Sequence, residues 1–179
     1  MIKKVTVTDD EISKAREFSD IYKQNNYGKN VLGVTDEEFI HFIFIGKLAE
    51  LAVKRFFEEA NVEILADEML IPCENEHRVG ADITLKYSQQ EIDVKVAHLE
   101  FHKRLLVRED QFRAHIHDIY IGAKCTDNRN VYIHGYIKGA ELAKKPISNF
   151  GYFDCRAEWL NQLKPIDDLV LKAKNGIII

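Results

Sequence analysis

The chain has 179 residues, of which 46% are hydrophobic and 30% charged, with a formal net charge of −4 at pH 7. This composition predicts one globular domain and excludes both a disordered chain and a polycation that coats nucleic acid through charge alone. No apolar run reaches the length of a membrane span, no leader-like segment opens the chain, and three well-separated cysteines favour free thiols, so we expect a cytoplasmic protein without membrane association.

Two helices are expected in the N-terminal part of the chain. Thr8 and Thr35 each precede a glutamate by three residues, which is the pattern of a capping box. Apolar residues at helical spacing follow both, and they predict helices over about residues 9–24 and 36–60. In the second helix, we expect Gly46 to allow the close approach of another backbone.

Glu50 lies on the second helix, at the edge of its apolar stripe. One interpretation is a surface ion pair with Lys47 or Lys54, worth a few tenths of a kcal/mol. The other is a metal ligand that reaches inward from the helix. Position alone favours the surface pair.

A mostly β centre and a mixed C-terminal part follow. The pattern predicts strands at 62–65, 105–107, 118–125 and 131–137, a short helix or turn at 108–115, a short helix at 138–144, and a loop-rich segment at 147–155. This order predicts a three-layer α/β domain with a mixed central β-sheet flanked by helices. We expect a helical part over residues 1–60, a sheet core over 61–137 and a C-terminal cap over 138–179.

The stretch 80–96 alternates with a period of two and predicts a β-hairpin. If its arms pair, Asp82, Asp93 and Lys95 project from one surface of the sheet. Two carboxylates and an ammonium group among β-branched residues are costly to desolvate unless something binds them. A hard divalent cation would satisfy the carboxylates.

These elements together resemble the PD-(D/E)XK nuclease superfamily, which has the restriction-endonuclease-like fold. The matching motifs are Gly46-Lys-Leu-Ala-Glu50 on a helix, Gly80-Ala-Asp82 on a strand and Asp93-Val-Lys95 on the next strand. The resemblance spans about residues 39–143. Ala81 stands where many members carry proline, a common replacement in the family.

The resemblance implies Mg²⁺-dependent hydrolysis of DNA phosphodiester bonds by a restriction, phage or repair endonuclease, with Mn²⁺ as a substitute ion. Asp82 and Asp93 would hold the metal, helped by the backbone carbonyl of Val94 and by Glu50, which thereby becomes a site residue. Lys95 would orient the attacking water and polarise the phosphate.

A basic and aromatic segment follows the hairpin and suggests contacts to nucleic acid. The candidates are His98, His102, Lys103, Arg104, Arg108 and, because similar domains often carry a glutamine there, Gln111. A solvated loop face explains the same pattern equally well. The histidine pairs 98/102 and 115/117 lack matching cysteines, so the sequence does not predict a zinc site.

The alternative function is a nuclease-like domain that binds nucleic acid or a partner protein without cutting. The retained charges of Asp82, Asp93 and Lys95 argue for the enzyme. The sequence does not show whether the substrate is DNA or RNA, or whether it is double-stranded or single-stranded. Specificity would come from loops at 67–79 and 146–155, from a homodimer, which is the simplest route to a double-strand break, or from a partner protein.

Overall fold

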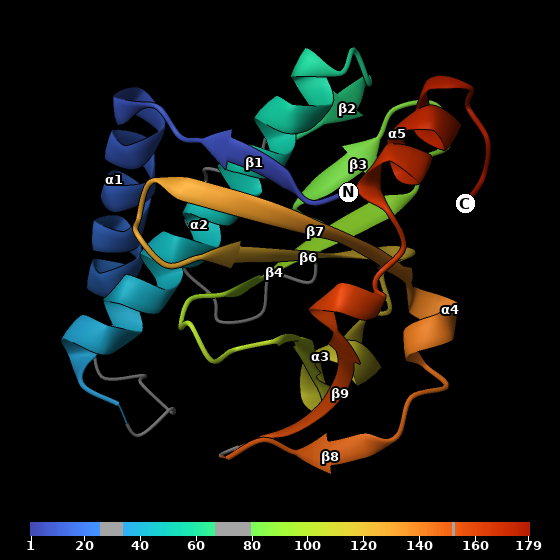
Figure 1. The fold of residues 1–179 in the computed structure, drawn as a ribbon. Helices are drawn as coiled ribbons and strands as arrows, with labels where there is room; N and C mark the ends of the chain where they lie inside the picture. The colour runs from blue at the N-terminus through green and yellow to red at the C-terminus, as the bar shows by residue number, and fades with distance from the viewer. Residues whose placement is uncertain (26–33, 67–79, 152) are drawn as a thin grey trace.

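A mixed six-stranded sheet runs through the computed structural model, which describes residues 1–25, 34–66, 80–151 and 153–179 (Figure 1). In their order across the sheet, the strands are β1 (Lys3–Thr6), β7 (Asn130–Lys138), β6 (Ile119–Cys125), β4 (Glu91–Ala97), β3 (Ile83–Leu85) and β2 (Ile64–Leu65). Strands β4 and β6 pair in parallel, and the other neighbours pair antiparallel. The predicted α/β class with a mixed sheet is confirmed.

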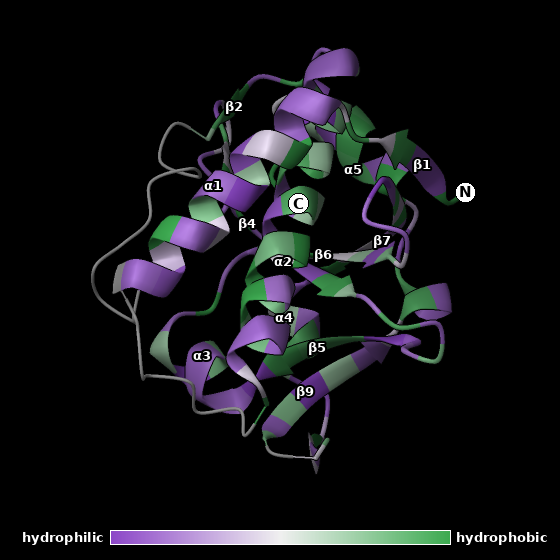
Figure 2. Cartoon of the chain, turned by 90° about the vertical axis from the view of Figure 1, so that its left-hand side faces the viewer, coloured by the Kyte–Doolittle hydropathy of each residue, from purple (hydrophilic) through white to green (hydrophobic). Residues whose placement is uncertain are grey.

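Two N-terminal helices, α1 (Asp9–Asn25) and α2 (Asp36–Glu59), form where the sequence predicts them. The Thr35 side chain accepts a hydrogen bond from the Glu38 N–H group at 3.2 Å, and the Glu38 carboxylate accepts one from the Thr35 N–H group at 2.9 Å. This capping box satisfies donors that the first helical turn leaves free. Figure 2 shows that α1 is largely hydrophilic, whereas α2 is richer in hydrophobic residues, several of which are buried.

The main hydrophobic core lies between α2 and the six-stranded sheet. Leu48 and Ala52 of α2 are fully buried there, together with Ile92 of β4 and Ile121 of β6. The prediction for Gly46 is wrong, because a Cβ atom built on it would meet no described atom within 4 Å. In the described part of the chain, no helix is both long enough and apolar enough to cross a membrane.

A second sheet of three antiparallel strands was not predicted. It contains β5 (Arg104–Arg108), β9 (Asp154–Trp159) and β8 (Ile147–Asn149), in that order. The prediction of a loop-rich segment over 147–155 is therefore wrong for both β8 and the start of β9. All three residues of β8 are exposed, so this edge strand shows no hydrophobic alternation, and pairing with β9 holds it in place.

The second sheet and several short helices cover the other face of the central sheet. A separate hydrophobic cluster fills this layer, with Leu105 of β5, Tyr120 of β6 and Leu163 among its members. The helical elements of this layer are α3 (Glu109–Ala114), α4 (Gly139–Leu142) and the 3₁₀ turn η1 (Leu160–Gln162), whereas α5 (Ile166–Lys174) packs into the main core through Ile166, Leu169 and Ala173. Strand β1 is an edge strand of the central sheet.

Candidate active site

The predicted hairpin is formed by β3 and β4, with Ile83 opposite Ile92. Just before β3, the Asp82 N–H group donates a hydrogen bond to the Ile92 carbonyl at 3.0 Å. The Asp82 Oδ2 atom accepts a hydrogen bond from the Val94 N–H group at 2.8 Å. The side chain of Asp82 thus takes a place that a backbone acceptor would occupy if the ladder continued, and its carboxylate is held against β4.

Alternation along β4 separates the core from the candidate site. Ile92 and Val94 are buried in the core, whereas Asp93 and Lys95 project from the opposite face. The Lys95 Nζ atom donates a hydrogen bond to Asp93 Oδ1 at 3.1 Å and lies 2.9 Å from Asp93 Oδ2. That Oδ2 atom is buried and accepts no well-aligned hydrogen bond from the described residues. This carboxylate oxygen can therefore accept a further hydrogen bond or coordinate a cation.

Lys95 is held as a cation. Burial on its own would lower the pKa of the ammonium group, but the Asp93 and Asp82 carboxylates outweigh this effect and raise the pKa. The group is therefore protonated at neutral pH, where it can donate hydrogen bonds but cannot accept a proton.

Glu50 enters the same region from α2 and pairs with Lys47. The pair is not on the surface, since the two side chains are only 14% and 7% exposed, so the surface interpretation of Glu50 is wrong. Burial raises the pKa of Glu50 although Lys47 opposes the shift, and the charge of Asp93 raises it further. Glu50 therefore shares an electrostatic environment with the two hairpin carboxylates.

Glu50, Asp82 and Asp93 form what we call the carboxylate cluster. The pKa of Asp82 is raised well above its usual value, first by burial and then by the charges of Glu50 and Asp93. When all groups are ionised, three carboxylates face two ammonium groups, Lys47 and Lys95, so one negative charge is left over among the described residues. A proton or a cation would neutralise this charge.

The carboxylate cluster fits Mg²⁺ in the chemistry of its donors. All its ligand atoms are oxygens, which hard divalent ions prefer, and one of them, Asp93 Oδ2, is buried without a hydrogen bond. The donor atoms do not all lie within 4.8 Å of one another. Such spacing is compatible with Mg²⁺, which usually keeps several waters and binds through one or two carboxylates.

A pocket of about 440 Å³ begins at Lys95 and extends along the basic segment that the sequence singled out. Its walls include Phe101, His102, Lys103, Arg104, Phe150 and Trp159. Phe101 is 72% exposed and Trp159 is 41% exposed. The Arg104 guanidinium lies 4.0 Å from the centre of the Trp159 ring and 5.2 Å from that of Phe150. We call this feature the aromatic pocket.

The other predicted nucleic-acid contacts lie elsewhere or are engaged with protein groups. The His98 ring lies 4.7 Å from that of Phe42 at a tilt of 48° and meets the His102 ring edge-on at 4.9 Å. Burial lowers the pKa of both histidines, so neither is a cation at neutral pH. Arg108 forms an ion pair with Asp110 and, like the exposed Gln111 of α3, does not line the aromatic pocket.

Sequence reasoning missed two neighbours of the site and placed a third, Lys47, on the surface. Tyr120 of β6 lies opposite Asp93 in the parallel pair, and burial raises the pKa of its hydroxyl to about 12. Trp159 reaches the aromatic pocket from a distant part of the chain, and nothing near it in the sequence marks this role. Lys47 had a signal, namely its spacing of three residues from Glu50.

Two of the three cysteines, Cys125 and Cys155, are buried free thiols, and Cys73 lies outside the described residues, as does the predicted loop at 67–79. The site thus consists of the carboxylate cluster, two lysines and the adjoining aromatic pocket. The chain matches no protein-family model, no curated protein and no solved structure.

Proposed function

We propose that this chain is a Mg²⁺-dependent endodeoxyribonuclease of the PD-(D/E)XK type, with the restriction-endonuclease-like version of the α/β fold. One observation carries the proposal. Asp82, Asp93 and Lys95 come from the two arms of the hairpin, in a buried region where the described carboxylates outnumber the described ammonium groups, and Asp93 Oδ2, which is ion-paired with Lys95, accepts no well-aligned hydrogen bond from the described residues. A structural ion pair has no need of this excess of carboxylates.

Asp82 and Asp93 would hold the ion, together with Glu50 and the backbone carbonyl of Val94. When bound, Mg²⁺ supplies positive charge that stabilises the phosphate in the transition state and activates water. Mn²⁺ would take the same oxygen ligands.

Lys95 is the residue that contacts the substrate. Its ammonium is anchored by Asp93 and stays protonated, so it donates hydrogen bonds to a non-bridging phosphate oxygen and orients the attacking water. It does not remove the proton from that water. Lys47 has a different task, since it partly neutralises Glu50 from within α2.

The aromatic pocket supports nucleic acid as the substrate. Lys103 is exposed and forms no ion pair with any described residue, so it is available to backbone phosphates. Phe101 and Trp159 expose aromatic rings to which an unpaired base can stack. A homodimer would provide a second site for the other strand of a duplex.

The alternative is a domain that binds nucleic acid or a partner protein without cutting. The Lys47–Glu50 pair favours it, because this carboxylate already has a partner within the protein. Metal binding separates the two functions. Tight binding of Mg²⁺ or Mn²⁺ that is lost in Asp82→Ala supports the enzyme, and its absence in the wild type supports the binding domain.

The decisive experiment is a cleavage assay with labelled plasmid, linear duplex, single-stranded DNA and RNA, each with Mg²⁺, Mn²⁺ or a chelator. Lys95→Ala is the test variant, and Lys86→Ala, an exposed lysine paired with Glu63, is the matched control. We expect metal-dependent cutting of DNA that Lys95→Ala abolishes and Lys86→Ala retains. Cutting that survives in Lys95→Ala would contradict the assigned mechanism.

A further inference from the structure

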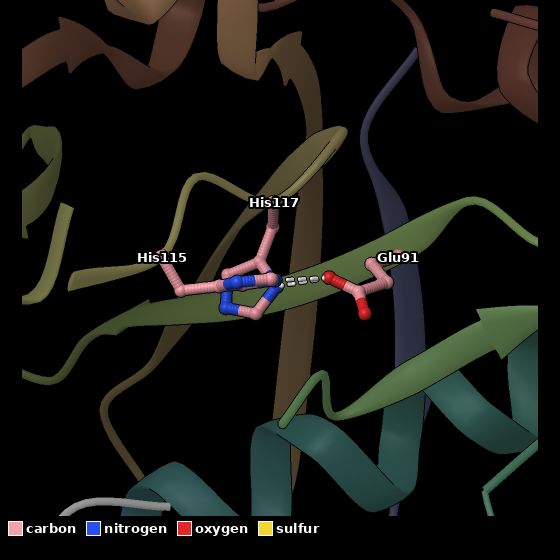
Figure 3. Close-up of side chains that lie close together, drawn as sticks. All are labelled: Glu91, His115 and His117. Carbon is pink, nitrogen blue, oxygen red and sulfur yellow. Dashed lines mark hydrogen bonds and ion pairs between the residues drawn. The ribbon is translucent and has the colours of Figure 1, made fainter. Parts of the chain in front are cut away.

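Glu91, His115 and His117 bring three potential ligand atoms together, and we call them the histidine cluster (Figure 3). Glu91 begins β4, and the two histidines lie between α3 and β6. One carboxylate oxygen, Glu91 Oε2, faces both Nε2 of His115 and Nδ1 of His117, the latter at 3.2 Å. The three ligand atoms all lie within 4.8 Å of one another, and no other trio of acidic, histidine or cysteine side chains in the described ranges does so.

The spacing of these atoms suits a tetrahedral ion. Ligands at about 2.0–2.1 Å from zinc are about 3.3–3.4 Å apart along each edge of the tetrahedron. The 3.2 Å between Glu91 and His117 is close to this value. His115 and Glu91 are each only half-buried, so their side chains can rotate to bring the distances from His115 to the other two ligand atoms to this value.

The backbone around the histidine cluster is fixed without any ion. The Glu91 N–H group donates a hydrogen bond to the Asp118 carboxylate at 2.9 Å, and the His117 N–H group donates one to the Tyr120 hydroxyl at 3.2 Å. Gly139 packs so closely that a Cβ atom there would lie 2.1 Å from the His117 carbonyl oxygen. The ligands therefore converge before a metal binds, which lowers the entropy that binding must overcome.

The donor set differs from that of the carboxylate cluster. Two imidazole nitrogens and one carboxylate oxygen suit borderline transition ions such as Zn²⁺, whereas Mg²⁺ prefers oxygen ligands alone. Three protein ligands leave a fourth position open to water or to another small ligand.

We propose that Glu91, His115 and His117 form a separate site for a divalent transition ion of the Zn²⁺ class. The bound ion joins the start of β4 to the segment that leads into β6. Glu91 precedes Asp93 by two residues on the same face of β4, so the site stands about 7 Å along the strand from the carboxylate cluster. The site does not depend on the proposed nuclease function.

The test uses Co²⁺ as a spectroscopic probe and Zn²⁺ as its competitor, with the purified full chain. We expect one equivalent of Co²⁺ with the intense visible bands of a tetrahedral site, displaced by Zn²⁺ and not by Mg²⁺. Glu91→Gln and His115→Ala should weaken binding at least about 100-fold. His134→Ala on β7, outside the histidine cluster, should bind as the wild type does.

Thermal unfolding provides a second measurement. Zn²⁺ at about 100 times its dissociation constant should raise the Tm of the wild type by about 5 to 10 °C and leave that of His115→Ala unchanged. Because His117 is buried, His117→Ala is informative only if circular dichroism shows it folded. Failure of the wild type to bind Co²⁺ or Zn²⁺ would overturn the proposal, as would equal binding by wild type, Glu91→Gln and His115→Ala. Either result would mean that the three side chains are joined by hydrogen bonds alone.

Discussion

Asp82→Asn should stabilise the protein without metal and remove its stabilisation by Mg²⁺. The substitution keeps the shape of the side chain, and the amide oxygen can still accept the hydrogen bond from the Val94 N–H group, now 2.8 Å from Asp82 Oδ2. What it removes is one of the three carboxylates whose charges are only partly balanced by Lys47 and Lys95.

The magnitude follows from the uncompensated buried charge. Replacing poorly compensated buried charges with neutral groups commonly stabilises a protein by about 1 to 3 kcal/mol, which for a chain of this size raises the Tm by about 2 to 12 °C. With Mg²⁺ at about 100 times its dissociation constant, the wild type gains about 2.7 kcal/mol that the variant lacks. Mg²⁺ should therefore offset about 2.7 kcal/mol of the variant's advantage in chelator, and it should reverse the order of the two stabilities if that advantage is smaller.

The effect also has a defined pH dependence. Burial, followed by Glu50 and Asp93, raises the pKa of Asp82 in the folded state, so the folded chain binds this proton more tightly than the unfolded chain does. In chelator, the wild type should then lose stability relative to Asp82→Asn as the pH rises from the unfolded pKa of about 4 to the raised folded pKa. Below the unfolded pKa, this contribution to the difference should vanish.

Thermal unfolding followed by circular dichroism, in chelator and in Mg²⁺ across a pH series, measures both effects. Asp20→Asn, on the exposed face of α1, is the matched control and should follow the wild type in every condition. An Asp82→Asn variant that is less stable than the wild type in chelator at pH 7 would refute the reasoning about buried charge. An unchanged response to Mg²⁺ would remove Asp82 from the metal site.

Three further substitutions test other parts of the structure. Burial opposes ionisation of Glu109, but Arg113 and Arg156 outweigh it and lower its pKa. Glu109→Gln should therefore lower the free energy of unfolding in urea by about 1 to 2 kcal/mol at pH 7 and leave it unchanged below the folded pKa of Glu109. A difference between variant and wild type that stays the same at every pH would contradict this. Trp159→Ala should weaken single-stranded DNA binding about 5- to 100-fold by fluorescence anisotropy, and unchanged affinity would exclude stacking. Thr35→Ala should lower the free energy of unfolding by about 1 kcal/mol, and an equal midpoint in urea would exclude the cap.

Local patterns in the sequence were sufficient for the two N-terminal helices and for the hairpin. The capping box at Thr35 and the period of two along β4 depend on residues only a few positions apart, so α2 and the shared face of Asp93 and Lys95 could be predicted. The second sheet could not, because the exposed strand β8 has no pattern of its own and exists by pairing with β9.

The surroundings of these side chains depend on contacts between distant parts of the chain. The parallel register that sets Asp93 opposite Tyr120 also brings Glu91 beside the segment with His115 and His117. The sequence shows the two histidines, but their acidic partner is on another strand. The burial of Glu50 could not be predicted either, because its spacing from Lys47 predicts an ion pair whether the pair is exposed or buried. Register and burial follow from packing of the whole chain, which no short window of sequence contains.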